Sequence, residues 1–195
     1  MFLYGILIGL IIGKIRKGKF EKFGYLTIEY PALVIVGLLM QIMVFMLNLG
    51  LSDLGETITK GILIGSYGFL IFAIFLNRRI RFLVIVFLGT LFNFVAMAMN
   101  DFSVGVTMKA AEKAFDPDIV DLIVSGHVKY FTIIPESQFY RGAFLACRQW
   151  SLYPTVITLG DLIIALGMIL VIQNIMTDKS IRKGTNIRYS KKLFR

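Results

Sequence analysis

The 195-residue chain has few of the residues on which disulfide scaffolds, metal sites and hydrolytic centres are built. It contains one cysteine, Cys147, and one histidine, His127. A single cysteine excludes an internal disulfide framework and a zinc site made of several cysteines. One histidine with scattered carboxylates is a poor metal ligand set as well. We therefore expect no metal and no other cofactor.

Catalytic motifs are also lacking. The chain has no P-loop, no GxSxG motif, no HExxH motif and no pair of DxxD motifs. A membrane cysteine protease would need His127 to activate Cys147. The two residues lie twenty positions apart, whereas the agr-type peptide-processing proteases place histidine and cysteine close together. We assign no catalytic residue and favour a non-catalytic protein, with a membrane peptidase or lipid-modifying enzyme as one alternative.

Long apolar runs dominate what is present. Apolar residues make up 57% of the chain, compared with about 45–50% in soluble domains. They gather into five runs, and a helix needs roughly 20 residues to cross about 30 Å of hydrocarbon. The sequence therefore predicts an all-α fold, a polytopic membrane helix bundle with five transmembrane helices. The predicted spans are about 2–18, 31–49, 59–76, 82–99 and 158–176.

The first run is short, and it carries glycine at every fourth position, at Gly5, Gly9 and Gly13. A cleaved signal peptide is a rival interpretation, but a basic stretch follows the run instead of a cleavage site. Glycines at this spacing make a flat groove on one helix face, against which a partner helix packs closely. Gly61 and Gly65 begin the third run in the same way. Packing within the chain and contact in a homodimer both remain open.

The basic residues predict the orientation of the spans. Most of the 21 lysines and arginines follow the first run, separate the third from the fourth, or lie in the tail 177–195. The positive-inside rule then places the N-terminus outside and the C-terminus in the cytoplasm. The net charge of +9 is thereby explained by attraction to anionic lipids at the cytoplasmic face, without nucleic acid. We expect a multi-pass protein of the cell (cytoplasmic) membrane, with the lipid bilayer and a membrane-protein partner or second copy as its partners.

The outer segment 100–153 is longer than an ordinary connection and so is expected to have its own structure. Asp116-Pro117-Asp118 is typical of a helix start, and Gly126 of a helix end. Residues 107–115 form another short helix candidate. We predict a partly helical outer cap on a single membrane domain, residues 1–176. The second half of the outer segment is rich in residues of the kind that form an aromatic belt at a membrane surface, namely Phe131, Phe139, Tyr140, Phe144, Trp150, Leu152 and Tyr153.

A few polar residues interrupt the apolar runs. Asn93 and Asn100 lie seven residues apart and thus on one helix face, and Gln41 lies in the second span. Asp161 is a carboxylate inside a predicted span, and such a residue is a functional candidate. Thr158 precedes it by three positions, which also fits a capping box at the start of a helix. Capping and a site role therefore both remain open for Asp161.

Four stretches together resemble an uncharacterised bacterial family of small five-span membrane proteins, the domain of unknown function DUF5317. They are GILIGLIIGKIRKGKF, LFNFVAMAMNDFSVGVT, GHVKYFTIIPES and TLGDLIIALGMILVIQ. The resemblance implies a membrane location and no known activity. This chain has Asp101-Phe102-Ser103-Val104 where the family is expected to have a Gly-Gly-Arg-Met-Pro-like turn. The residues that match the family pattern are Asn93, Asn100, His127, Glu136, Gly160 and Asp161.

Most of these residues fall at or beyond the outer ends of the fourth and fifth spans. We therefore predict an outward-facing polar pocket, roofed by the long segment, for a small polar solute or a lipid head group. The favoured function is a non-catalytic accessory or binding protein, and a small-solute or lipid transporter is the main alternative. The binding residues predicted for this pocket are Asn93, Asn100, His127, Glu136 and Asp161.

Overall fold

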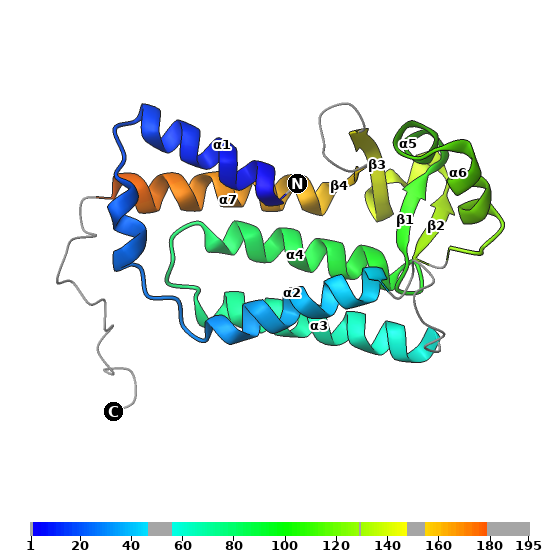
Figure 1. Ribbon diagram of the computed structural model, residues 1–195, viewed down its shortest axis with the longest axis horizontal. Coiled ribbons are helices and arrows are strands. Elements are labelled where there is room, and N and C mark those ends of the chain that lie inside the picture. Colours follow the sequence, from blue (N-terminus) through cyan, green and yellow to red (C-terminus); the bar gives the residue numbers. More distant parts are fainter. Residues whose placement is uncertain (1, 47–55, 129, 148–154, 179–195) are drawn as a thin grey trace.

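The computed structural model describes residues 2–46, 56–128, 130–147 and 155–178. Long apolar helices form one part of the molecule, and a small α/β unit, which we call the cap, covers one end of them (Figure 1). Each long helix begins within a few residues of the start of one of the five predicted spans. The helices are α1 (Phe2–Ile15), α2 (Pro31–Met46), α3 (Glu56–Leu76), α4 (Leu83–Ala98) and α7 (Leu159–Thr177).

The helices differ in whether they are long enough to cross a membrane. In the described part of the chain, residues Thr57–Leu76 of α3 and Leu159–Thr177 of α7 are long and apolar enough to do so. The apolar segments of α1, α2 and α4 are shorter. Helix length by itself thus identifies two candidate spans, fewer than the five predicted.

The long helices pack side by side in the order α1, α7, α4, α3, α2. The glycine face of α1 lies against α7, because a Cβ atom at Gly5 would be 2.9 Å from Cα of Ala165 and one at Gly9 would be 3.2 Å from Cα of Ile169. These glycines therefore serve packing within the chain. The matching motif on α3 differs, since nothing lies within 4 Å of the place where Gly61 would carry a Cβ. Gly65 approaches only the side chain of Met40.

The end of the helices opposite the cap carries the basic link and its short helix η1 (Phe20–Tyr25) (Figure 1). Basic residues of the link hold the end of α7 in place. Nη1 of Arg16 donates to Oε1 of Gln173 at 2.8 Å, and Nζ of Lys22 donates to the carbonyl oxygen of Asp178 at 2.6 Å. Buried Asn77 exchanges hydrogen bonds with the backbone of Glu29, which ties the link to the end of α3.

The cap contains a four-stranded sheet, so the all-α prediction is wrong in this respect. The strand order is β2-β1-β3-β4, with β1 parallel to β2 and β3, and with β3 antiparallel to β4. The two predicted short helices are present as α5 and α6, and the side chain of Thr107 caps α5. The elements are β1 (Val104–Thr107), α5 (Met108–Ala114), α6 (Pro117–Val124), β2 (Phe131–Ile134), η3 (Glu136–Arg141), β3 (Gly142–Cys147) and β4 (Thr155–Thr158).

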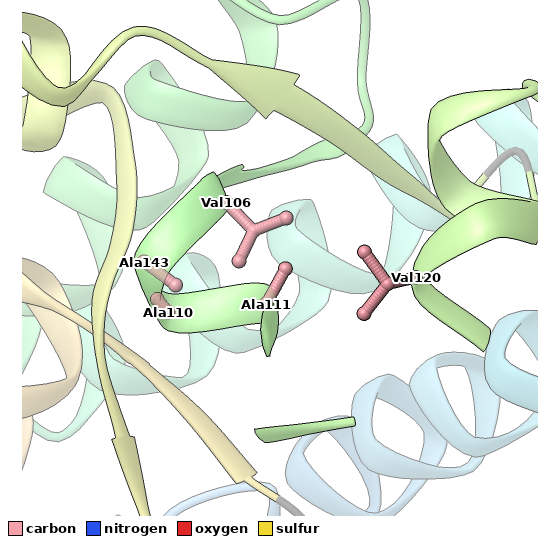
Figure 2. Close-up of a cluster of buried hydrophobic side chains, with 5 residues drawn as sticks. All are labelled: Val106, Ala110, Ala111, Val120 and Ala143. Atoms are coloured by element: carbon pink, nitrogen blue, oxygen red, sulfur yellow. The ribbon is translucent and has the colours of Figure 1, made fainter. Parts of the chain in front are cut away.

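The sheet has its own small hydrophobic core. Small residues of α5 let that helix lie close to β1 and β3, and one valine of α6 closes the cluster (Figure 2). The cap is therefore a packed unit and not a loose loop. The core residues are Val106, Ala110, Ala111, Val120 and Ala143.

Candidate functional site at the junction of helices and cap

Asn93, Thr158 and Asp161 form a hydrogen-bonded cluster where β4 passes into α7. Nδ2 of Asn93 donates to Oδ1 of Asp161 at 3.1 Å. The hydroxyl of Thr158 donates to Oδ1 of Asn93 at 2.7 Å. Asn93 thus bonds to both side chains of the α7 start, and the cluster joins α4 to α7. We call these three residues the junction cluster.

Asp161 also completes the predicted capping box. The Asp161 backbone N–H donates to the Thr158 hydroxyl oxygen at 3.0 Å, and the Thr158 backbone N–H donates to Oδ2 of Asp161 at 3.1 Å. These bonds satisfy backbone donors that the first turn of a helix leaves unpaired. Both carboxylate oxygens of Asp161 therefore accept a hydrogen bond inside the protein. The arrangement suits anchoring better than proton transfer or ion coordination.

Two glycines let α4 and α7 approach closely enough for these bonds. A Cβ at Gly89 would lie 2.8 Å from the Gly160 carbonyl oxygen, and one at Gly160 would overlap the side-chain oxygen of Asn93. Gly160 was one of the residues that match the family pattern, and the structure gives it a packing role. Because Gly160 has no side chain, there is room beside it for the amide of Asn93.

A cluster of apolar and aromatic side chains lies beside the junction. Tyr130 packs there against Val44, Leu63 and Met97, which come from α2, α3 and α4. Burial raises the pKa of Tyr130 above its ordinary value of 10.0, and the negative charge of Asp161 raises that pKa further. Tyr130 is therefore a neutral phenol at physiological pH, close enough to Asp161 to be influenced by its charge.

Asn100 has a second anchoring role, at the end of α4. Its Nδ2 donates to the Ala96 carbonyl oxygen at 2.9 Å and to the Arg141 carbonyl oxygen at 2.6 Å. The Arg141 guanidinium in turn donates to the Met99 carbonyl oxygen and, at 2.9 Å, to Oε1 of Gln138. The end of α4 and η3 thus each donate a side-chain hydrogen bond to a backbone carbonyl oxygen of the other.

His127 and Glu136 are exposed on the cap, and their hydrogen bonds lie within it. Nδ1 of His127 is 2.8 Å from the hydroxyl of Ser125, beyond the end of α6. Oε1 of Glu136 accepts from the Lys109 backbone N–H at 3.2 Å, at the start of α5. Of the five predicted binding residues, the structure joins Asn93 to Asp161 by a hydrogen bond and places the other three in different local networks.

Cys147 and His127, the pair considered for a cysteine protease, lie on different segments of the cap. Cys147 ends β3, where it pairs with Thr155 of β4, whereas His127 follows α6. The described residues hold no group of three or more histidine, cysteine, aspartate or glutamate side chains that could bind a metal ion. Sequence reasoning missed Tyr130 and Arg141. Nothing in the local pattern marks either of them, because their partners lie on distant segments.

The comparisons with known proteins identify a family without supplying an activity. A model of the family of unknown function DUF5317 matches residues 25–173, which is more than half of the chain. The match includes the junction cluster and the whole cap, and it begins after α1. No curated protein and no solved structure matches the chain. The resemblance seen in the sequence is confirmed, and the chain belongs to the DUF5317 family, a family of unknown function.

Proposed function

We propose that this chain is an integral membrane protein that crosses the bilayer five times and presents its cap outside the cell. The observation that carries the proposal is the arrangement of the molecule, in which the cap and the basic link lie at opposite ends of the long helices (Figure 1). The basic link then lies at the cytoplasmic face, as the positive-inside rule requires. The N-terminus is outside, and the tail 177–195 is cytoplasmic.

The surface of the helices supports a lipid environment. Leu3, Leu7 and Ile11 of α1 are 70%, 55% and 60% exposed, and Ile15 is 74% exposed. A soluble monomer rarely exposes a contiguous apolar surface of this extent, because water disfavours it. Lipid tails accept such a surface at no cost. Helices shorter than the hydrocarbon core are accommodated by local thinning of the bilayer and by basic side chains that extend to the head groups.

Basic residues at the end of the helices opposite the cap suit anionic lipid head groups. Arg78 and Arg81 are held over the rings of Phe75 and Phe82, at 4.7 and 5.1 Å from the ring centroids. Each basic residue near an anionic surface contributes about 1 kcal/mol of attraction. We include anionic lipids among the partners of the protein on this ground.

We further propose that the protein has a non-catalytic accessory or binding role and that the cap is its recognition surface. The hydrogen bonds of the junction cluster support this role, since they fix the cap on the helices and engage both oxygens of Asp161. His127 and Glu136 remain exposed on the outer surface, where a solute, a head group or a neighbouring protein reaches them. Binding is thus proposed for the cap surface, and anchoring for Asn93 and Asp161.

The topology is tested by labelling single cysteines in intact cells with a membrane-impermeant maleimide. In a Cys147→Ser background, Glu112→Cys reports on the cap and Glu21→Cys on the basic link, and neither change alters a basic residue. We expect Glu112→Cys to be labelled from outside and Glu21→Cys to be labelled only after the cells are permeabilised. Labelling of Glu21→Cys in intact cells would contradict the proposed orientation.

The binding role is tested by photo-crosslinking in living cells. A photoreactive residue at His127 should give one or a few discrete adducts, whereas one at Leu88, on the exposed face of α4, should give none beyond lipid. A photoreactive residue is also placed at the neighbouring exposed Leu122. If neither position gives a discrete adduct, a recognition surface on this side of the cap is contradicted.

A further inference from the structure

Three aromatic rings form a row on η3 and β3. The rings of Phe139 and Tyr140 meet edge to face with centroids 6.2 Å apart, and those of Phe139 and Phe144 meet in the same way at 5.5 Å. Phe139 is 44% exposed and Tyr140 is 47% exposed. We call Phe139, Tyr140 and Phe144 the aromatic row. Mutual edge-to-face contacts hold the rings together while a large part of their apolar surface faces outward.

The aromatic row is attached to the outer end of α4. Arg141 directly follows Tyr140, and its guanidinium donates to the carbonyl oxygen of Met99, just beyond the last residue of α4. Its carbonyl oxygen accepts the 2.6 Å hydrogen bond from Nδ2 of Asn100. The position of the row along the axis of α4 is therefore fixed by hydrogen bonds on both sides of Arg141.

Helix α4 is too short to cross a membrane by itself. Its 16 residues span about 24 Å at 1.5 Å per residue, compared with about 30 Å of hydrocarbon. Exposed apolar residues recur along one face at helical spacing and stop at the end of the helix. This exposed stripe consists of Val84, Leu88, Leu91, Val95 and Met99.

We propose that the aromatic row enters the outer membrane interface and completes the apolar thickness that α4 lacks. The proposal rests on the proposed function, because it requires α4 to be a membrane span. Phenylalanine and tyrosine suit this depth, since their rings are apolar and the tyrosine hydroxyl reaches the head groups. The partner of the row is thus the lipid interface, and the row sets how deeply the cap sits on the bilayer.

The depth of the row is tested by fluorescence quenching with brominated lipids. Trp150 is the single tryptophan of the chain, so Trp150→Phe gives a background without tryptophan. Three full-length variants then each carry one tryptophan, namely Phe139→Trp in the row, Leu88→Trp on the exposed stripe and Glu112→Trp on α5. Each is reconstituted into phosphatidylcholine vesicles whose acyl chains are brominated either near the head group or near the methyl end.

Phe139→Trp should show blue-shifted emission and lose most of its intensity with bromine near the head group and less with bromine near the methyl end. Glu112→Trp should stay red-shifted and unquenched, because Glu112 is exposed on α5 and belongs neither to the aromatic row nor to the exposed stripe. If Leu88→Trp is quenched while Phe139→Trp is not, the inference fails and the membrane proposal stands. If Leu88→Trp is not quenched either, both fail. Blue-shifted emission from Phe139→Trp without quenching would mean that protein, such as a second copy, covers the row, and this too would overturn the inference.

Discussion

Asn93 and Asp161, 68 residues apart in the chain, are joined by a 3.1 Å hydrogen bond between α4 and the first turn of α7. The same carboxylate closes the capping box with Thr158, the last residue of β4. One side chain thus starts a helix, joins it to a neighbouring helix and fixes the strand that leads into it. The residue that sequence reasoning considered for a pocket or for a capping box therefore helps to hold the cap on the helices.

Removing either partner of this hydrogen bond should destabilise the protein cooperatively. We expect Asp161→Ala to lower the free energy of unfolding by about 1–2 kcal/mol, because it removes the carboxylate half of the capping box and the acceptor of the Asn93 amide. A double-mutant cycle with Asn93→Ala should give a coupling energy of at least about 0.5 kcal/mol. Unfolding in mixed micelles measures both quantities.

Gln41→Ala on α2 is the matched control, since it also removes an amide from an apolar helix. It should show no coupling to Asp161→Ala. Additive effects of Asn93→Ala and Asp161→Ala would show that the 3.1 Å contact carries no interaction energy.

The two GILIG motifs should respond differently to the same substitution. Gly5→Leu places a side chain against the backbone of Ala165, so we expect a loss of about 1–3 kcal/mol from overpacking. Gly61→Leu places the same side chain where nothing lies within 4 Å, and leucine also favours helix more than glycine does. Thermal unfolding in detergent should therefore show a lower Tm for Gly5→Leu and an equal or higher Tm for Gly61→Leu. Equal losses would contradict the packing of α1 on α7.

Alkaline pH should destabilise the protein partly through Tyr130. Below pH 10.0 its phenol is protonated in both the folded and the unfolded chain, so its contribution to stability is complete. Above this value the unfolded chain releases the proton while the folded chain retains it, because the folded pKa is raised. The free energy of unfolding then falls as pH rises, by up to about 1.4 kcal/mol per pH unit.

Tyr130→Phe removes this proton and should make the alkaline loss less steep than in the wild type. Unfolding curves recorded from pH 8 to pH 11, on the order of one curve per half unit, measure the slope. An unchanged slope above pH 10 would show that Tyr130 does not titrate differently in the folded and unfolded states.

The turn after α4 should favour glycine at its first position. Asp101 has φ of +54°, in the left-handed region, where most side chains cost about 1–2 kcal/mol and aspartate is better tolerated than most. Asp101→Gly relieves this cost and loses an exposed ion pair with Lys60, which contributes about 0–1 kcal/mol. We expect its stability to equal or exceed that of the wild type, whereas Asp101→Val should lose more than about 1 kcal/mol, because a β-branched residue suits this region poorly. A more stable Asp101→Val in chemical unfolding would contradict the assigned turn.

This turn lies where the chain departs from the pattern that the resemblance leads one to expect. The resemblance leads one to expect two glycines where the chain has Asp101 and Phe102. In the structure both residues have positive φ, the conformation that glycine adopts most readily. The backbone of the turn is therefore one that would suit glycine at both positions. Phe102 offsets part of its strain by packing beside Val44, Leu63 and Met97.

Local patterns predicted the helices well and the sheet not at all. The helix over Pro117–Val124 follows from Asp116-Pro117-Asp118, since a proline at the first position and an early acid favour a helix start. The strands of the cap are only four to six residues long, and VGVT, FTII and TVIT offer little beyond β-branched residues. A strand of this length gains its stability from its neighbours in the sheet. Such pairing over long sequence distances leaves no periodic signal.

The sequence by itself determined where the apolar helices lie and offered a capping box at the start of α7, because these depend on residues within a few turns of one another. The tertiary structure alone decided that Gly5 packs against α7 while Gly61 does not, and that Asn93 bonds to Asp161 while Asn100 bonds to Arg141. Identical local motifs meet different neighbours once the chain folds. Close packing and hydrogen bonds act over a few ångströms, so only the arrangement in space assigns their partners.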